Sequence, residues 1–447
     1  KKTLLADLSV YSGFRAKGET VFTGYEFLDT DSTVLGIIVG GQSVQHASAG
    51  DIADVILAET SLYPESGGQE ADAGRIIGKG FELEVLDVQR PVKGLISHKV
   101  EVTSGEVGVG DAATSIVDPE WRRGATQAHS ATHVIHAALR EVLGPQAHQA
   151  GSYNKAGYMR LDFNWNQALS PATRSEIEEV SNTAIRSNLE VETRVMPLDE
   201  AKAMGAMALF GEKYGQTVRV VDIGGPWSRE LCAGTHVARS SEIGLINLVS
   251  ESSVGSSNRR IESLVGIEGF KDLALERTIV SQLSANLKTP REQLPERIAE
   301  IMANLKAAEK KIAEFQSVAI VQRVPALLEA ATRTGGLVRV IEDLGVVGSA
   351  DDVRTLVTAV RSRLGSDASV VALAAEVSAG DSGKPVVIVA TNEAARNAGV
   401  KAGVLSKLAA GILGGGGGGK DDLAQGGGSD VSAIGSALEA VGKALPA

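Results

Sequence analysis

Apolar and polar residues alternate in short runs over the first quarter of the chain. Residues 19–25, 33–39, 81–88 and 98–102 carry this two-residue period, and glycine-rich turns separate them. A two-residue period places every second side chain on one face of a strand. Several short strands at such spacing are typical of a small barrel. We therefore expect residues 1–119 to form a β-barrel.

Helical and strand patterns mix after residue 120. Apolar side chains recur at steps of three and four in residues 128–143 and 171–188, which predicts two helices. Residues 199–207 predict a third, shorter helix. The predicted strands in this part are residues 191–196, 219–223 and 243–250. We expect residues 120–265 to form an α+β domain.

A sustained 3.5-residue repeat sets residues 266–325 apart. Its apolar positions are Leu294, Ile298, Ile301, Leu305, Ala308, Ile312, Phe315 and Ala319. This period predicts a coiled-coil helix of nearly four heptads. Thr289-Pro290 separates it from an earlier predicted helix, residues 269–287. The two helices could form an antiparallel hairpin arm, or one of them could pair with another chain.

The last part, residues 326–447, has the pattern of a compact α/β domain. The predicted strands are residues 337–341, 370–375 and 385–390, and the predicted helices are residues 351–364 and 404–413. Asp351 or Asp352 is expected to cap the first of these helices. The predicted fold class is therefore a multidomain α+β protein: a small β-barrel, an α+β domain, a helical coiled-coil arm and a C-terminal α/β domain.

The composition indicates in which cellular compartment the protein is expected. The chain has 447 residues, of which 43% are hydrophobic, which is enough for several cores. Its single cysteine excludes a disulfide framework and fits a reducing compartment. There is no signal peptide and no apolar run of about 18 residues. We expect a cytoplasmic protein without a membrane span.

The net charge of −11 argues mildly against nucleic-acid binding, because phosphate contacts require lysine and arginine. Total charge says little about one face of a multidomain protein, however. Basic residues cluster locally at Arg122, Arg123, Arg259, Arg260, Arg396, Lys401, Lys407 and Lys420. Each cluster is either an ordinary solvated face or part of a nucleic-acid surface.

The strongest chemical signal is two pairs of residues with equal spacing. His129 and His133 lie four apart on a predicted helix, so both imidazoles share one face. Cys232 and His236 lie four apart after a predicted strand. Three imidazoles and one thiolate suit a divalent transition metal, above all zinc. The sequence therefore predicts a zinc site.

Two other catalytic readings have less support. A zincin protease requires glutamate directly after the first histidine as its general base, and Ser130 stands there. A cysteine protease would use Cys232 as nucleophile and His236 as base, but no other local signature supports it. His136 shares the face of His129 and His133, where it is either a substitute ligand or, more simply, a supporting residue.

Five segments, in order and spacing, strongly resemble the editing domain of the alanyl-tRNA synthetase family. They are Tyr63–Gln69, His129–Arg140, Gly205–Tyr214, Glu230–His236 and Arg259–Glu262. One departure is Ala233, where many members have glycine; we expect it to change backbone freedom rather than ligation. The resemblance continues through residues 414–428 to a C-terminal domain shared with DHH-type phosphoesterases. It implies a C-terminal fragment without the aminoacylation domain.

The resemblance implies hydrolysis of the ester that links serine or glycine wrongly to tRNA(Ala). A pocket that accepts alanine excludes glycine poorly, and it rejects an added hydroxyl weakly, so a second sieve is needed. Gln149 matches a position that lines the editing pocket of the family, and Ser152 and Arg260 are further candidates. Four protein ligands would close the zinc shell as in structural sites, whereas three would leave a position for water or substrate.

The glycine run Gly414–Gly419 followed by Lys420 nearly matches the motif of a phosphate-binding P-loop. Asp421 stands where that motif needs a hydroxyl, and the run follows a predicted helix, so we reject ATP binding. A flexible linker is the simple alternative. With the resemblance, we expect nucleic-acid contact at Lys420, Gln425 and Gly427, since backbone without Cβ atoms can approach a phosphate.

The expected partners are thus tRNA(Ala) carrying serine or glycine and a second copy bound through the C-terminal region. The alternative function is a non-catalytic tRNA-binding and dimerisation module.

Overall fold

The computed structural model describes residues 8–208, 214–379 and 382–446. The chain divides into two compact units, residues 1–282 and 283–447. The predicted multidomain α+β class is confirmed, because both units combine helices with mainly antiparallel sheets.

The first unit begins with a six-stranded antiparallel barrel. Its strands run in the order β10-β7-β8-β9-β5-β2, and β2 closes the barrel by pairing with β10. They are β2 (Asp29–Val39), β5 (Ile52–Leu57), β7 (Gly74–Gly78), β8 (Phe81–Val92), β9 (Leu95–Gly108) and β10 (Ala112–Val117). Shorter pieces are α1 (Leu8–Arg15), β1 (Val21–Phe22), β3 (Gln42–Val44), β4 (His46–Ser48) and β6 (Glu59–Thr60). The predicted barrel is confirmed.

The alternation in the sequence becomes the inside and outside of this barrel. Along β8, Phe81, Leu83 and Val85 are buried, while Glu84 and Leu86 between and beyond them are exposed. The register pairs each strand with its neighbour so that these buried positions meet in one core.

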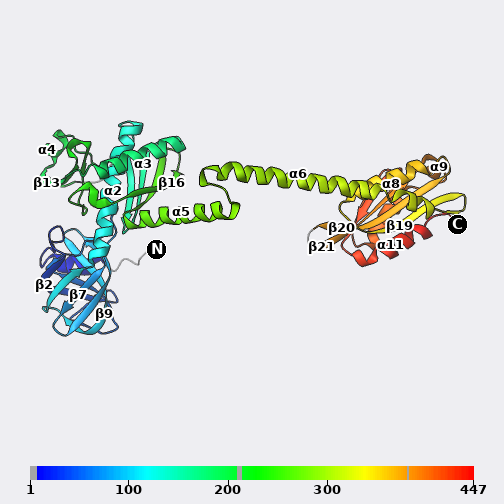
Figure 1. Cartoon of the computed structure of the whole chain (residues 1–447). Helices are drawn as coiled ribbons and strands as arrows, with labels where there is room; N and C mark the ends of the chain where they lie inside the picture. The colour runs from blue at the N-terminus through cyan, green and yellow to red at the C-terminus, as the bar shows by residue number, and fades with distance from the viewer. Residues whose placement is uncertain (1–7, 209–213, 380–381, 447) are drawn as a thin grey trace. The chain divides into compact units, whose positions relative to one another are not determined.

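Helix α2 (Pro119–Leu143) leads from the barrel to the rest of the unit (Figure 1). Asp118 caps it by accepting hydrogen bonds from the backbone N–H groups of Glu120 and Trp121. The helix begins nine residues before the predicted start. Its first turns lack apolar periodicity because they contact the barrel through polar groups, such as the Trp121 indole N–H bonded to the Ala71 carbonyl.

A four-stranded antiparallel sheet packs against α2 and α3 (Pro171–Arg186). Its order is β11-β12-β17-β16, with β11 (Gln149–Lys155), β12 (Tyr158–Asn164), β16 (Ile246–Val254) and β17 (Asn258–Val265). A separate three-stranded sheet joins β13 (Val191–Pro197), β14 (Thr217–Ile223) and β15 (Ser228–Leu231), next to α4 (Leu198–Ala203). Five residues of the Gly205–Tyr214 segment, 209–213, lie outside the described residues.

Helices α5 (Ile267–Leu287) and α6 (Leu294–Val321) match the two predicted helices. On α6 the heptad side chains of Ile298, Ile301, Leu305 and Ile312 are exposed. How these helices pair stays a prediction.

The second unit is built on a six-stranded mixed sheet, ordered β18-β19-β20-β21-β23-β22. The strands are β18 (Thr332–Thr334), β19 (Leu337–Val347), β20 (Ser369–Ala379), β21 (Ser382–Thr391), β22 (Gly417–Gly419) and β23 (Leu423–Gly427). The helices are α7 (Val324–Glu329), α8 (Ala350–Arg363), α9 (Glu393–Asn397), α10 (Ala402–Ile412) and α11 (Ile434–Lys443). Along β20, Val370 and Ala372 face the core with α10 and α11, while Val371 and Leu373 face the core with α8.

One detail of the second unit corrects the predicted helix cap, and another excludes the flexible-linker alternative for the glycine run. Ser349, not Asp351 or Asp352, caps α8, since its hydroxyl accepts from the Asp352 backbone N–H. The glycine run is not a flexible linker, because Gly417–Gly419 form the edge strand β22 against β23.

None of the helices within residues 8–208, 214–379 and 382–446 combines the length and apolar character that crossing a bilayer requires.

Candidate metal centre

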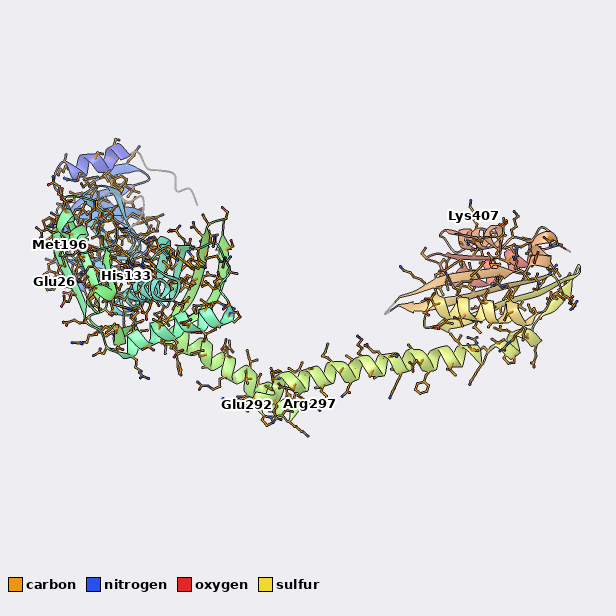
Figure 2. The ribbon with its side chains drawn as sticks, turned by 90° about the horizontal axis from the view of Figure 1, so that it is seen from above. Glu26, His133, Met196, Glu292, Arg297 and Lys407 are labelled. Atoms are coloured by element: carbon orange, nitrogen blue, oxygen red, sulfur yellow. The ribbon has the colours of Figure 1, made fainter. Side chains whose placement is uncertain are left out.

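The two predicted ligand pairs come together in the first unit. His129 and His133 lie one turn apart on α2, Cys232 follows the last residue of β15, and His236 lies in the next loop. Four potential ligand atoms, one from each residue, lie within 4.8 Å of one another. The Cys232 Sγ atom is 3.3 Å from Nε2 of His129 and 3.3 Å from Nε2 of His236. His133 lies inside the unit (Figure 2).

Each of the three imidazoles has a different partner at Nδ1. His129 Nδ1 lies 2.8 Å from Gln69 Oε1, and His236 Nδ1 lies 3.1 Å from the Ser130 hydroxyl. His133 Nδ1 lies 3.2 Å from Glu230 Oε2, an ion-pair distance without the alignment of a hydrogen bond. An imidazole that is held through Nδ1 presents Nε2 for ligation, and such partners fix both tautomer and orientation.

Gln69 connects His129 on α2 with the loop that carries Cys232 and His236. Its Oε1 accepts from the Thr235 backbone N–H at 2.9 Å as well as facing His129, and its Nε2 donates to the Thr235 hydroxyl at 2.9 Å. The amide is fully buried. The Tyr63–Gln69 segment thus orients a ligand histidine and the Cys232–His236 loop at once.

The loop after β15 is held tightly. A Cβ atom on Gly234 would lie 2.0 Å from His129 Cε1, so only glycine fits there. Arg219 Nη1 donates to the carbonyls of Cys232 and Gly234, and its guanidinium lies 4.3 Å from the ring centre of Tyr25. The Tyr25 hydroxyl donates to the Ala233 carbonyl at 2.6 Å. A barrel residue therefore supports the metal loop directly.

Glu230 and His136 form a second layer behind the ligands. The Glu230 carboxylate, also near His133, lies 2.9 Å from His136 Nδ1. His136 Nε2 accepts the Gln149 backbone N–H at 3.2 Å. An N–H can only donate, so Nε2 carries no proton and Nδ1 donates to Glu230. Because both nitrogens of His136 are engaged, it is a supporting residue rather than a substitute ligand.

The enclosed charges shift the pKa values of these groups strongly. Burial alone would raise the pKa of the Cys232 thiol, but the imidazoles of His129, His236 and His133 hold it well below its usual range. Burial would likewise lower the pKa of His133, but Glu230 and Cys232 raise it to about 10. A thiolate is therefore favoured at neutral pH, and a thiolate is the form that binds metal.

The donor set fits zinc. Bond lengths of about 2.05 Å to nitrogen and 2.3 Å to sulfur place tetrahedral ligand atoms about 3.5 Å apart. The observed Sγ to Nε2 distances of 3.3 Å are close to this separation.

A cavity of about 380 Å³ opens beside the cluster. It is lined by His129, His133 and Cys232, by the predicted residue Gln149, and by Ser66, Gly67, Arg90, Thr132, Tyr214, Gly215, Thr217, Val218, Arg219, Glu230, Leu231 and Ala233. Ser152 does not line it but accepts a hydrogen bond from Gln149 Nε2 at 3.1 Å. Arg260 also lies outside the lining and pairs with Asp162 at 2.7 Å.

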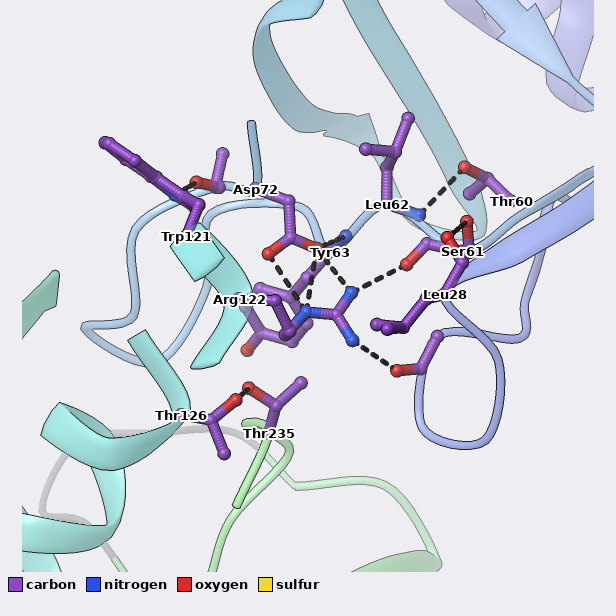
Figure 3. A network of polar contacts seen from close by, with 12 residues as sticks. Leu28, Thr60, Ser61, Leu62, Tyr63, Asp72, Trp121, Arg122, Thr126 and Thr235 are labelled. Carbon is purple, nitrogen blue, oxygen red and sulfur yellow. Dashed lines mark hydrogen bonds and ion pairs between the residues drawn. The ribbon is translucent and has the colours of Figure 1, made fainter. Parts of the chain in front are cut away.

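The arginine cluster at the start of α2 is not a nucleic-acid surface at Arg122. That side chain is buried and pairs with Asp72, while its other nitrogens donate to the carbonyls of Gly24 and Ser61 (Figure 3). Arg123 remains exposed and pairs with Glu120. The sequence alone could not show which of these two arginines is buried, because that depends on which one faces the barrel in the fold.

The predicted nucleic-acid residues lie along strands β22 and β23. Lys420 is exposed between them, whereas Gln425 Oε1 accepts from Arg354 Nη2 at 2.6 Å. A Cβ atom on Gly427 would lie 2.9 Å from the Pro385 carbonyl oxygen, so packing already requires glycine there. Lys407 projects from the surface of this unit (Figure 2).

Comparisons with known proteins agree with the site. A family model for class II (A) tRNA synthetases matches residues 1–121, and one for the threonyl and alanyl tRNA synthetase second additional domain matches residues 218–262. The DHHA1 domain model matches residues 337–446. The alanine–tRNA ligase of Clavibacter sepedonicus is 72% identical over 445 residues, which cover 100% of this chain and 50% of that protein. The chain belongs to the alanyl-tRNA synthetase family.

The match to this family runs along the whole chain. The alanine–tRNA ligase of Leifsonia xyli subsp. xyli is 70% identical over 445 residues and covers the same shares of both chains. The chain thus spans about half the length of the curated relatives it matches. A solved C-Ala domain of the Aquifex aeolicus alanyl-tRNA synthetase is 24% identical, covers 25% of this chain and 95% of its own, and has a TM-score of 0.22.

Several supporting residues could not be assigned a role from the sequence. Gln69 and Glu230 lay in quoted motifs without an assigned role, and Arg219, Tyr25 and Arg90 carried no signal of their own. The role of Gln69 could not be found from the sequence, because its burial and its contacts with His129 and Thr235 exist only in the folded chain.

Proposed function

We propose that the metal centre removes serine or glycine from mischarged tRNA(Ala) by hydrolysing the aminoacyl ester. One observation carries the proposal: a cavity large enough for an amino acid and part of a ribose opens directly onto the His129, His133 and Cys232 side chains. The membership of the alanyl-tRNA synthetase family supports this choice of substrate.

Zinc is the metal that we propose for the four ligands His129, His133, Cys232 and His236. The thiolate and the three imidazole nitrogens are the donors that zinc prefers. When bound, zinc supplies a Lewis acid next to the cavity. Cys232 is partly exposed and lines the cavity with His129 and His133, so the side of the cluster that faces the cavity is accessible to a substrate.

The residues around the cluster orient the substrate in this proposal. Gln149 is held at its backbone by His136 and at its side chain by Ser152, so its amide has a fixed position in the cavity wall. We propose that Gln149 contacts the aminoacyl group and that Ser152 positions Gln149. Arg260 is kept as a proposed residue of the same site, although its guanidinium pairs with Asp162 outside the cavity lining.

The second unit is proposed to bind tRNA through Lys420, Gln425 and Gly427 and to mediate a homodimer, in a cytoplasmic protein. The finer domain division into residues 1–119, 120–265, 266–325 and 326–447 is part of the same proposal.

The test is deacylation of Ser-tRNA(Ala) and Gly-tRNA(Ala) by the chain and by Cys232→Ala, with zinc content measured for both. We expect the wild type to release the amino acid and the variant to lose at least 100-fold in rate together with its metal. Arg123→Ala, on the same helix but exposed, should keep both activity and zinc. If no variant hydrolyses either ester but all bind tRNA, the chain is the non-catalytic binding module instead.

A further inference from the structure

The cavity beside the metal centre has two arginines in its wall, and they differ in how many contacts their side chains make. Arg219 is fully committed to the loop of Cys232 and Gly234 and to the Tyr25 ring. Arg90, near the end of β8, is exposed, and its side chain has no hydrogen bond or ion pair among the residues that the structure describes. An available guanidinium therefore stands at the mouth of the cavity.

The backbone position of Arg90 is fixed by the strand that carries it. The Glu65 backbone N–H donates to the Val88 carbonyl at 2.9 Å, and Gln89 Nε2 donates to Glu65 Oε2 at 2.7 Å. These contacts fasten the Tyr63–Gln69 segment to β8 directly before Arg90. Ser66 and Gly67 of that segment line the cavity with Arg90. A Cβ atom on Gly67 would meet nothing within 4 Å, so this rim is open to a ligand.

Among the residues that line the cavity there are two arginines and one acidic residue, which favours an anion. The carboxylate in the cavity lining is that of Glu230, which is buried and faces the imidazoles of His133 and His136. Arg90 thus lies in the wall of the same cavity as the ligands His129, His133 and Cys232.

We propose that Arg90 forms a phosphate subsite that binds the phosphodiester group next to the terminal nucleoside of the RNA. This inference rests on the proposed function. In an amino acid ester of a 3′-terminal ribose, the 5′ phosphate of that nucleoside is the nearest permanent negative charge to the ester. A guanidinium binds phosphate oxygens through two parallel N–H donors. Such a contact positions the RNA and reads no base.

The first test compares two substrates with wild type and Arg90→Gln. One is the seryl ester of an RNA minihelix, and the other is the seryl ester of adenosine, which has no phosphate. We expect Arg90→Gln to raise KM for the minihelix ester about tenfold with kcat within twofold, and to leave the adenosine ester unchanged. The slope of log KM against the logarithm of the salt concentration should become smaller by about 0.7. This is the change expected when one phosphate contact to a single strand is lost.

The matched control is Arg75→Gln, an exposed arginine on β7 of the same barrel and outside this cavity. Arg75→Gln should leave KM and kcat unchanged for both substrates. If Arg90→Gln impairs both esters equally, or neither, the subsite is wrong. Hydrolysis of the adenosine ester by both proteins supports the proposed activity independently of the subsite.

A second measurement needs no hydrolysis. Binding of adenosine, of a dinucleoside monophosphate ending in adenosine, and of free serine is measured by calorimetry. Wild type should bind the phosphate-containing compound about tenfold more tightly than Arg90→Gln does, with equal affinity for adenosine. Should the variant instead weaken only the binding of free serine, whose carboxylate is the other anion available, Arg90 recognises the product and the proposal fails.

Discussion

His136 and Gln149 are joined by a hydrogen bond in which the imidazole Nε2 atom accepts the backbone N–H at 3.2 Å. The same imidazole donates from Nδ1 to Glu230, which also faces the ligand His133. One buried carboxylate therefore sets the orientation of a metal ligand and, through His136, the backbone position of a residue in the cavity wall.

Replacing His136 separates these two effects. His136→Leu leaves the Gln149 N–H without an acceptor but keeps all four ligands, so we expect kcat for ester hydrolysis to fall 10- to 100-fold with one zinc retained. Glu230→Gln should instead weaken zinc affinity 10- to 100-fold, since it removes the negative partner of His133. Metal titration and single-turnover kinetics on both variants check this. Loss of zinc from His136→Leu would show that it is a ligand after all.

Gly234 is expected to tolerate no side chain. A Cβ atom there would lie 2.0 Å from His129 Cε1 and 2.1 Å from Nδ1, so Gly234→Ala must displace the ligand or the loop. We expect zinc affinity to fall more than 100-fold. The neighbouring Ala233→Gly is the control: Ala233 is exposed and has no positive φ, so this change should leave zinc binding within twofold. Unchanged zinc affinity in Gly234→Ala would contradict the close packing of loop and imidazole.

The buried pair of Arg122 and Asp72 is expected to hold the barrel to α2. Arg122→Met leaves the Asp72 carboxylate buried without its cation, which typically costs about 3 to 5 kcal/mol of stability. Arg123→Met on the next position removes an exposed pair and should cost less than about 1 kcal/mol. Urea unfolding followed by circular dichroism measures both. Equal losses of stability from the two substitutions would mean that the buried pair in Figure 3 stabilises the fold no more than the exposed pair does.

His98 should make the barrel sensitive to acid. Burial lowers its pKa to about 4, although the bond to the Val55 carbonyl opposes the shift. Between pH 6.5 and pH 4 the unfolded chain takes up a proton that the folded barrel does not. The free energy of unfolding therefore falls as pH drops through this window, by up to about 3 kcal/mol.

The check is thermal unfolding of wild type and His98→Gln at pH 7.5 and pH 5. We expect the variant to be less stable at pH 7.5 but to lose less on acidification. A pH dependence that is the same in both proteins would exclude His98 as its source.

The alternating strands of the barrel, the two long helices of the arm and the two ligand pairs were predictable from the sequence, since each depends on residues close together in the chain. Strand period, heptad period and the four-residue spacing of His129 and His133 are local properties of the backbone. The hairpin of β11 and β12 was missed, because residues 149–155 are mostly polar and their strand is stabilised by pairing with β12.

Tertiary structure alone decided which residues support the metal. His129 and Cys232 are 103 positions apart, and Gln69 reaches Thr235 across 166. It also decided that Arg122 is buried and Arg123 exposed, and that glycines 417–419 form an edge strand. The physical reason is common to all these cases: an unpaired polar group is costly to bury, so its position depends on a partner that the fold supplies from a distant segment.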